Sequence, residues 1–198
     1  MNAYILDNNS GGTTYIRWGR TTCPNDTSAK LVYDGYAAGS HYTHAGGGAN
    51  YVCLPRDPLF ETDVTGGLRS FMYGAEYEIP SGILNNLNNQ DVPCAVCRTP
   101  RTNVLMIPGR NLCFNDWQLE YHGFLMSSYL GHAASKEYTC MDIDPESLES
   151  GSENDNGALF YLVEGQCGAL KCPPYIQGQE ITCAVCSYRG GTNSTSGN

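Results

Sequence analysis

The stretch Cys94-Ala-Val-Cys97 returns later in the chain as Cys183-Ala-Val-Cys186, and much of the surrounding sequence returns with it. The halves align in the same order at a separation of about 88 residues, with small slips. The matches include Gly19-Arg20 with Gly109-Arg110, Cys23 with Cys113, Tyr33 and Gly35 with Tyr121 and Gly123, His44 with His132, Cys53 with Cys140, and Asp57-Pro58 with Asp144-Pro145. Four cysteines kept in register indicate an internal duplication.

Two copies are too few for a solenoid, which needs roughly three or more stacked units. We therefore expect one compact domain over residues 14–188. Half one is 14–100 and half two is 101–188, with a pseudo-twofold axis between them.

The composition is that of a globular, acidic protein. Hydrophobic residues make up 41% of the chain, enough for an ordinary core. A net charge of -9 with only 11 Lys and Arg argues against nucleic acid as a partner and suits cations. No run approaches the roughly 18 apolar residues of a membrane span, and the first residues lack a signal-peptide pattern. If the protein is secreted, we expect its signal to have been removed.

Short runs rich in β-branched and aromatic residues, bounded by Gly, Pro, Asn and Asp, predict β-strands. They cover residues 14–18, 30–33, 51–54, 71–78, 104–107, 118–121, 137–141, 158–163 and 180–185. No apolar period of 3.6 lasts three turns, and 81–89 allows one helical turn at most. The predicted fold class is all-β, disulfide-rich, with long loops and little helix.

Ten cysteines, an even number, favour disulfides. Zinc knuckles and redox-active pairs are the alternatives for the two Cys-x-x-Cys motifs. A separation of nearly ninety residues is unusual for a compact zinc site, and neither motif opens a helix. We expect Cys23 and Cys53 to bridge to Cys94 and Cys97, and Cys113 and Cys140 to Cys183 and Cys186, with the partners within each set left open. Cys167 and Cys172 should close a small loop on each other.

The same oxidising compartment is compatible with three glycosylation sequons, at Asn8, Asn25 and Asn193. We therefore predict an extracellular protein. Residues 1–13 form a polar-ended arm in which Tyr4, Ile5 and Leu6 could pair as a strand, and 189–198 form a polar tail. Both could dock on neighbouring copies, which predicts a homo-oligomer or fibre.

Four histidines invite a metal or catalytic role. His44 and His132 are equivalent in the duplication, and a residue kept in both copies favours a structural, interior imidazole over a ligand. Alternatively, His41, Tyr42 and His44, with His132, line a carbohydrate site where a ring packs on the apolar face of a hexose.

The halves differ most after the shared Asp-Pro. The second half continues as a loop dense in oxygen donors, and no Lys, Arg or His occurs between Glu137 and Leu170. Ca²⁺ takes six to eight oxygens from carboxylates, amides, backbone carbonyls and water. The candidate Ca²⁺ ligands are Asp142, Asp144, Glu146, Asn154, Asp155 and Asn156. A solvated acidic loop is the alternative, since the spacing is not that of an EF-hand.

Recognisable catalytic motifs are missing, including nucleophile elbows, phosphate-binding glycine loops and His-Glu-x-x-His. Glu76 and Glu78 lie two apart and could form a glycosidase carboxylate pair. We nevertheless predict that the protein is not an enzyme.

Several phrases resemble a known invertebrate family. They are Tyr15-Ile-Arg-Trp-Gly-Arg-Thr-Thr-Cys-Pro24, Gly35-Tyr-Ala-Ala-Gly-Ser-His-Tyr-Thr-His44, Tyr73-Gly-Ala-Glu-Tyr77, Val92-Pro-Cys-Ala-Val-Cys-Arg98 and Gly131-His-Ala-Ala134. In this order they resemble the noncollagenous domain of spongin-type short-chain collagens. No Gly-X-Y repeat occurs, so the resemblance concerns the globular module alone.

A second resemblance is to a disulfide-containing galactose-binding lectin type from sea anemones. That resemblance implies a homodimer that holds terminal β-galactose through bound Ca²⁺. Two functions follow as expectations: a secreted module that binds galactose-type glycans with Ca²⁺, or a structural subunit of an extracellular fibre or matrix.

Overall fold

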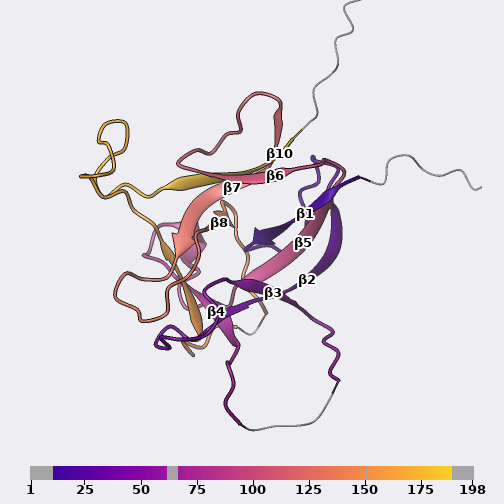
Figure 1. Ribbon diagram of the computed structural model, residues 1–198, viewed down its shortest axis with the longest axis vertical. Coiled ribbons are helices and arrows are strands. Elements are labelled where there is room, and N and C mark those ends of the chain that lie inside the picture. Colours follow the sequence, from indigo (N-terminus) through magenta and orange to yellow (C-terminus); the bar gives the residue numbers. More distant parts are fainter. Residues whose placement is uncertain (1–10, 62–66, 150, 189–198) are drawn as a thin grey trace, which may run out of the picture.

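The computed structural model describes residues 11–61, 67–149 and 151–188, and these fold almost entirely into β-strands (Figure 1). The strands are β1 (Thr13–Trp18), β2 (Lys30–Gly39), β3 (Val52–Pro55), β4 (Tyr73–Glu78), β5 (Pro93–Thr99), β6 (Val104–Pro108), β7 (Trp117–Ser127), β8 (Thr139–Asp142), β9 (Ala158–Leu162) and β10 (Thr182–Tyr188). A single 3-10 turn, η1 (Leu84–Asn86), is the helical element of the described residues. The all-β, disulfide-rich prediction is confirmed.

Every strand predicted from the sequence overlaps an observed one. One observed strand is missing from the prediction: β5, which carries Cys94-Ala-Val-Cys97. β2 and β7 are also longer than predicted because pairing with neighbours extends them past polar and glycine positions.

The same set of pairings occurs once in each half. β5 lies between β1 and β2, and β10 lies between β6 and β7, in both cases antiparallel. β3 then pairs with β2 as β8 pairs with β7. Figure 1 shows β6, β10 and β7 near the top and β1, β5 and β2 on the right.

The halves are joined into one sheet by strands from both. β8 pairs in parallel with β1, and β9 pairs in parallel with β4 and antiparallel with β7. The pairings therefore close a ring in the order β7-β8-β1-β5-β2-β4-β9. A twofold relation would also pair β3 with β6, and the described strands do not make that pairing. The common origin of the halves stays a prediction from the sequence.

The disulfides join early to late cysteines within each half. The bridges are Cys23–Cys97, Cys53–Cys94, Cys113–Cys186, Cys140–Cys183 and Cys167–Cys172. All ten cysteines are bridged, which leaves no thiolate for the zinc or redox alternatives. The choice of partners, open in the sequence, is the same in both halves.

The three-residue spacing of each Cys-x-x-Cys has a structural reason. Successive side chains of a strand point to opposite faces, so residues three apart lie on opposite faces. Cys94 belongs to one buried cluster and Cys97 to a second, while Cys183 belongs to that second cluster and Cys186 to a third. Each motif therefore anchors both faces of its strand.

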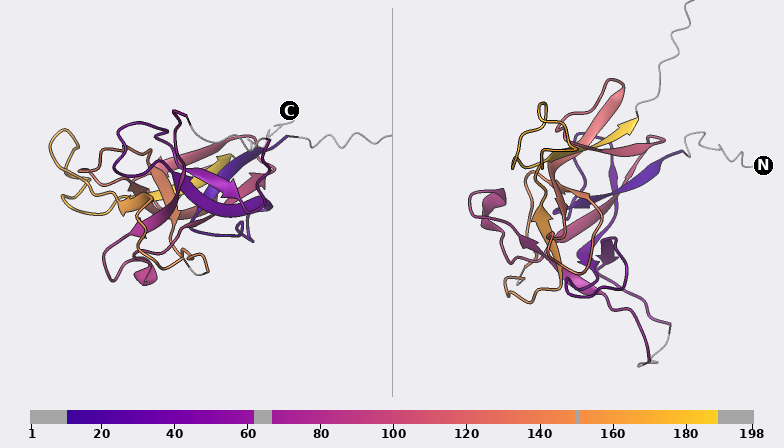
Figure 2. Two further views of the ribbon diagram at one scale, coloured as in Figure 1. Left: turned by 90° about the horizontal axis from the view of Figure 1, so that it is seen from below. Right: turned by 60° about the vertical axis from the view of Figure 1, so that its left-hand side comes forward.

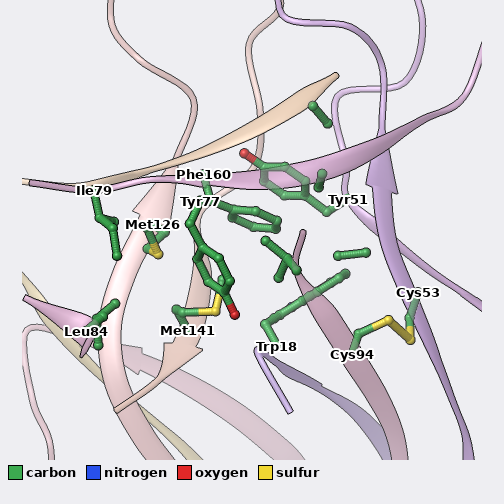
Figure 3. Packing of buried hydrophobic residues seen from close by; sticks show 14 residues of the cluster. Trp18, Tyr51, Cys53, Tyr77, Ile79, Leu84, Cys94, Met126, Met141 and Phe160 are labelled. Atoms are coloured by element: carbon green, nitrogen blue, oxygen red, sulfur yellow. A yellow bond between two sulfur atoms is a disulfide. The ribbon is translucent and has the colours of Figure 1, made fainter. Parts of the chain in front are cut away.

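The largest cluster lies at the centre of the ring and is rich in aromatic side chains (Figure 3). The rings of Tyr51 and Phe160 stack at 3.9 Å between centroids, and Trp18 lies 6.0 Å from Phe160. The Tyr51 hydroxyl donates a hydrogen bond of 2.6 Å to the Leu159 carbonyl, so its polar group is satisfied inside the core. This cluster holds β1, β4 and β9 together.

Long loops leave this body, and the described parts of the β3–β4 connection extend away from it in both figures of the whole molecule (Figures 1 and 2). Asn8 and Asn193, and most of the predicted arm and tail, lie outside the described residues. None of the described helices is long and apolar enough to cross a membrane.

Candidate functional site

The four residues expected to line a carbohydrate site lie together. They belong to a continuous cluster of aromatic side chains, called here the ring cluster. Its members are His41, Tyr42, His44, Tyr73, Tyr129, His132 and Tyr161. Tyr73, Tyr129 and Tyr161 were not predicted as members of this cluster. They come from three different parts of the chain, so no local sequence pattern indicates that they lie together.

Ring contacts run from one end of the cluster to the other. The His41 ring stacks on Tyr42 at 4.7 Å between centroids and lies 5.1 Å from His44. Tyr42 in turn lies 4.6 Å from His132, which contacts Tyr161 at 5.4 Å. The two loops that carry the histidines are thereby in direct contact.

Backbone hydrogen bonds fix these loops. The Tyr42 N–H donates to the Gly157 carbonyl at 3.1 Å, and the Ala134 N–H donates to the Tyr42 carbonyl at 3.1 Å. His44 and His132 each end a similar turn, in which the histidine N–H donates to the carbonyl three residues earlier. The two matched histidines therefore occupy equivalent backbone positions.

The expectation of interior imidazoles is corrected by their exposure. His44 is exposed, and His41 and His132 are half-buried. Burial lowers the pKa of His41, with a further contribution from His44, and burial also lowers the pKa of His132. Both rings are therefore mainly neutral at neutral pH.

The six expected calcium ligands fall into two groups. Asp142, Asp144 and Glu146 are bound by arginines from the end of β1. The Arg17 Nε lies 2.7 Å from an Asp142 oxygen, and Arg20 lies 2.9 Å from Asp144 and 3.0 Å from Glu146. These arginines are distant in sequence, and the parallel pairing of β1 with β8 brings them in. Each of these three carboxylates thus has at least one oxygen paired with an arginine, which disfavours a cation at this end of the loop.

Asn154, Asp155 and Asn156 lie instead beside Glu76 of β4. The Asp155 and Asn156 N–H groups donate to the Glu76 Oε1 at 3.1 and 2.7 Å. Glu76 is only 2% exposed, and its Oε2 is buried without a hydrogen-bond partner. Burial raises the pKa of Glu76, and the nearby Asp91 and Asp155 also raise it. Sequence reasoning considered Glu76 only as half of a catalytic pair.

This group adjoins the ring cluster. Gly157 follows Asn156 directly and accepts the hydrogen bond from Tyr42. A Cβ built on Gly157 would lie 3.0 Å from the Tyr73 side chain. The backbone that directly follows residues 154–156 therefore contacts Tyr42 and Tyr73.

Within the described residues, no three His, Cys, Asp or Glu side chains form a metal-binding group. A cation held beside Glu76 would therefore need amide, backbone, water or ligand oxygens as well, all of which Ca²⁺ accepts. The buried, unpartnered Glu76 Oε2 fits such a cation, because an uncompensated carboxylate oxygen is costly to bury.

On its other side the ring cluster borders a cavity of about 630 Å³. Tyr129, His132 and Tyr161 line it together with Glu78, Lys136 and Glu164. Glu78, the other half of the suggested catalytic pair, is half-buried, and burial raises its pKa. The remaining sequon within the described residues is at Asn25, whose side chain is exposed.

Comparison with models of known protein families finds no match, and comparison with curated proteins finds none either. The resemblance to noncollagenous domains and to the anemone lectins therefore stays a prediction from the sequence.

Proposed function

We propose that the protein is a secreted, non-catalytic module that binds galactose-type glycans with the help of Ca²⁺. The observation that carries the proposal is the convergence of His41, Tyr42, His44 and His132 from loops far apart in sequence. His44 is exposed and the other three side chains are half-buried, so part of each is accessible to a ligand.

The chemistry of the cluster suits a hexose. Aromatic faces stack on the apolar C–H face of a sugar ring, while neighbouring polar groups fix its orientation. A neutral imidazole has one donor and one acceptor nitrogen, and Nδ1 of His41 already pairs with Thr43, which leaves Nε2 for a ligand. The backbone that directly follows residues 154–156 contacts Tyr42 and Tyr73 of the same cluster.

Five disulfides and the absence of a membrane-crossing helix among the described residues suit a secreted protein. In this proposal the cation is held beside Glu76 by Asn154, Asp155 and Asn156. A bound Ca²⁺ supplies a positive centre to which vicinal sugar hydroxyls add as ligands. The side chains themselves position the sugar by stacking and hydrogen bonding.

The test is calorimetric titration with lactose, first in Ca²⁺ and then in a chelator. We expect heat of binding only with Ca²⁺. His44→Ala and Asp155→Asn should each weaken binding by about tenfold or more, a loss of about 1.4 kcal/mol.

Asp144→Asn is the matched control, because it removes a carboxylate of the same acidic loop that binds arginine instead. It should bind lactose as the parent does. Absence of heat in both conditions would overturn galactose recognition, and equal loss in Asp144→Asn and Asp155→Asn would overturn the placement of the cation.

A structural subunit is the second candidate, supported by two strand edges. Among the described strands, β3 pairs only with β2 and β6 pairs only with β10. A free edge can accept a strand from another copy, and Tyr4, Ile5 and Leu6 would provide one. Sedimentation of the full chain beside a chain lacking residues 1–10 tests this, since only the full chain should assemble.

A further inference from the structure

The cavity beside the ring cluster has aromatic walls. Tyr129, His132 and Tyr161 contact one another, with centroids 5.3 to 5.4 Å apart, and Tyr138 adds another ring to the lining. Aromatic faces carry negative electrostatic potential and attract cations, most strongly where water is excluded.

Three carboxylates line the same cavity, at Glu78, Glu164 and Glu180. Glu78 of β4 is the direct partner of Tyr161 in the β4–β9 pairing, so the carboxylate and the ring lie side by side. Glu164 and Glu180 face each other in an isolated antiparallel bridge. Opposed like charges on paired strands are destabilising unless a positive group lies between them.

The protein itself provides little positive charge here. None of the five ion pairs among the described residues involves Glu78, Glu164 or Glu180. Among the residues that the structure describes, Lys136 is the one lysine or arginine in the lining, and its buried amine donates to the Ser40 hydroxyl. Burial lowers the pKa of this amine.

We infer that this cavity binds an organic cation, specifically the ammonium group of an amino sugar. Rings would contact the cation, and the paired carboxylates would accept its N–H groups. A volume of about 630 Å³ matches a ligand of one or two sugar rings rather than a bare ion. The inference does not rest on galactose binding: His132 is shared between the two sites, but Glu78, Glu164 and Glu180 are not among the residues proposed to bind galactose or Ca²⁺.

Calorimetry with glucosamine, N-acetylglucosamine and glucose tests the inference, at pH 6.5 and with a chelator present. We expect glucosamine to bind at least tenfold more tightly than the two neutral sugars. Tetramethylammonium should compete with it, because it offers a cation without hydroxyl groups. Equal affinity for glucosamine and glucose would overturn the inference, whatever the outcome with lactose.

The double variant Glu164→Gln/Glu180→Gln should weaken glucosamine binding at least tenfold. Neither side chain is buried, so the variant should fold, and thermal unfolding checks this. Tyr129→Ala, at a ring that is 48% exposed, should also weaken binding. Asp57→Asn, an exposed carboxylate on the β3–β4 connection, is the matched control and should change nothing. Unchanged affinity in the double variant would show that these carboxylates do not hold the ligand.

Discussion

Glu76 is an acidic side chain that the fold buries with one of its two oxygens unpartnered. Burial raises its pKa above the ordinary value of 4.5, so the folded state holds its proton more tightly than the unfolded chain. The contribution of Glu76 to stability is therefore lost as the pH rises through 4.5 and then through the higher folded pKa.

We predict that Glu76→Gln raises the free energy of unfolding at pH 7 by about 1 kcal/mol in the absence of Ca²⁺. The amide keeps an oxygen for the two backbone N–H groups and removes the charge. Denaturant unfolding at pH 7 and pH 4 measures this, and the difference should vanish at pH 4, where both side chains are neutral. Added Ca²⁺ should stabilise the parent and not the variant, and equal stabilisation of both would argue against a cation at Glu76.

Arg17 and Asp142 form an ion pair in the body of the protein, with side chains 13% and 3% exposed. Arg17→Met leaves the buried Asp142 carboxylate without its counter-ion, and we expect a loss of about 3 to 5 kcal/mol. Arg56→Met is the comparison, because the Arg56–Asp34 pair is more exposed and should contribute less than about 1 kcal/mol. Urea unfolding of both variants measures the loss in free energy of unfolding. Equal losses would contradict the larger contribution expected of the buried Arg17–Asp142 pair.

At the scale of the strands, two matched glycines set the contact between neighbours. A Cβ on Gly35 would lie 1.7 Å from the Leu54 carbonyl oxygen, and one on Gly123 would lie 1.8 Å from that of Met141. The backbones of the paired strands β2 and β3 therefore approach each other closely at Gly35, and those of β7 and β8 do the same at Gly123.

We predict that Gly35→Ala and Gly123→Ala each cost more than about 4 kcal/mol, because backbone must move in either case. Gly74→Ala in β4 is the control, since its Cβ would meet nothing within 4 Å, and it should cost less than about 1 kcal/mol. Thermal unfolding of the three variants measures the contrast. Normal stability in Gly123→Ala alone would show that the two halves do not use the glycine alike.

Alternating hydrophobic and β-branched runs were enough to predict most strands, because that signal is local. Strand β5 was not predicted because Pro93 and the two cysteines obscure the alternation of polar and apolar residues, although most of its residues are buried. The ring contacts of His41 with Tyr73 and the capture of Asp142 by Arg17 depend on pairings between distant strands. A single sequence carries no local trace of such pairings, so the arginine partners of Asp142, Asp144 and Glu146 could not be predicted from it.

For the molecule as a whole, the ring of strands needs both halves. β1 pairs with β8, and β4 pairs with β9, across the boundary near residue 100. Side chains cross it too, since the Tyr15 hydroxyl donates to Glu120 at 2.9 Å. The central core takes Trp18 from one half and Phe160 from the other.

We predict that residues 14–100 and 101–188, produced separately, do not fold. Each would expose core that the other covers, and small domains have little stability to lose. Dispersion of amide resonances in NMR spectra measures this. A folded spectrum from either half alone would show that the halves are independent units.

Each of the five disulfides nonetheless joins two cysteines of the same half. In synthesis from the N-terminus, all four cysteines of half one, the last of which is Cys97, precede Cys113, the first cysteine of half two. During that interval the native partners of these cysteines are the cysteines that have already emerged, so the order of synthesis favours bridges within a half.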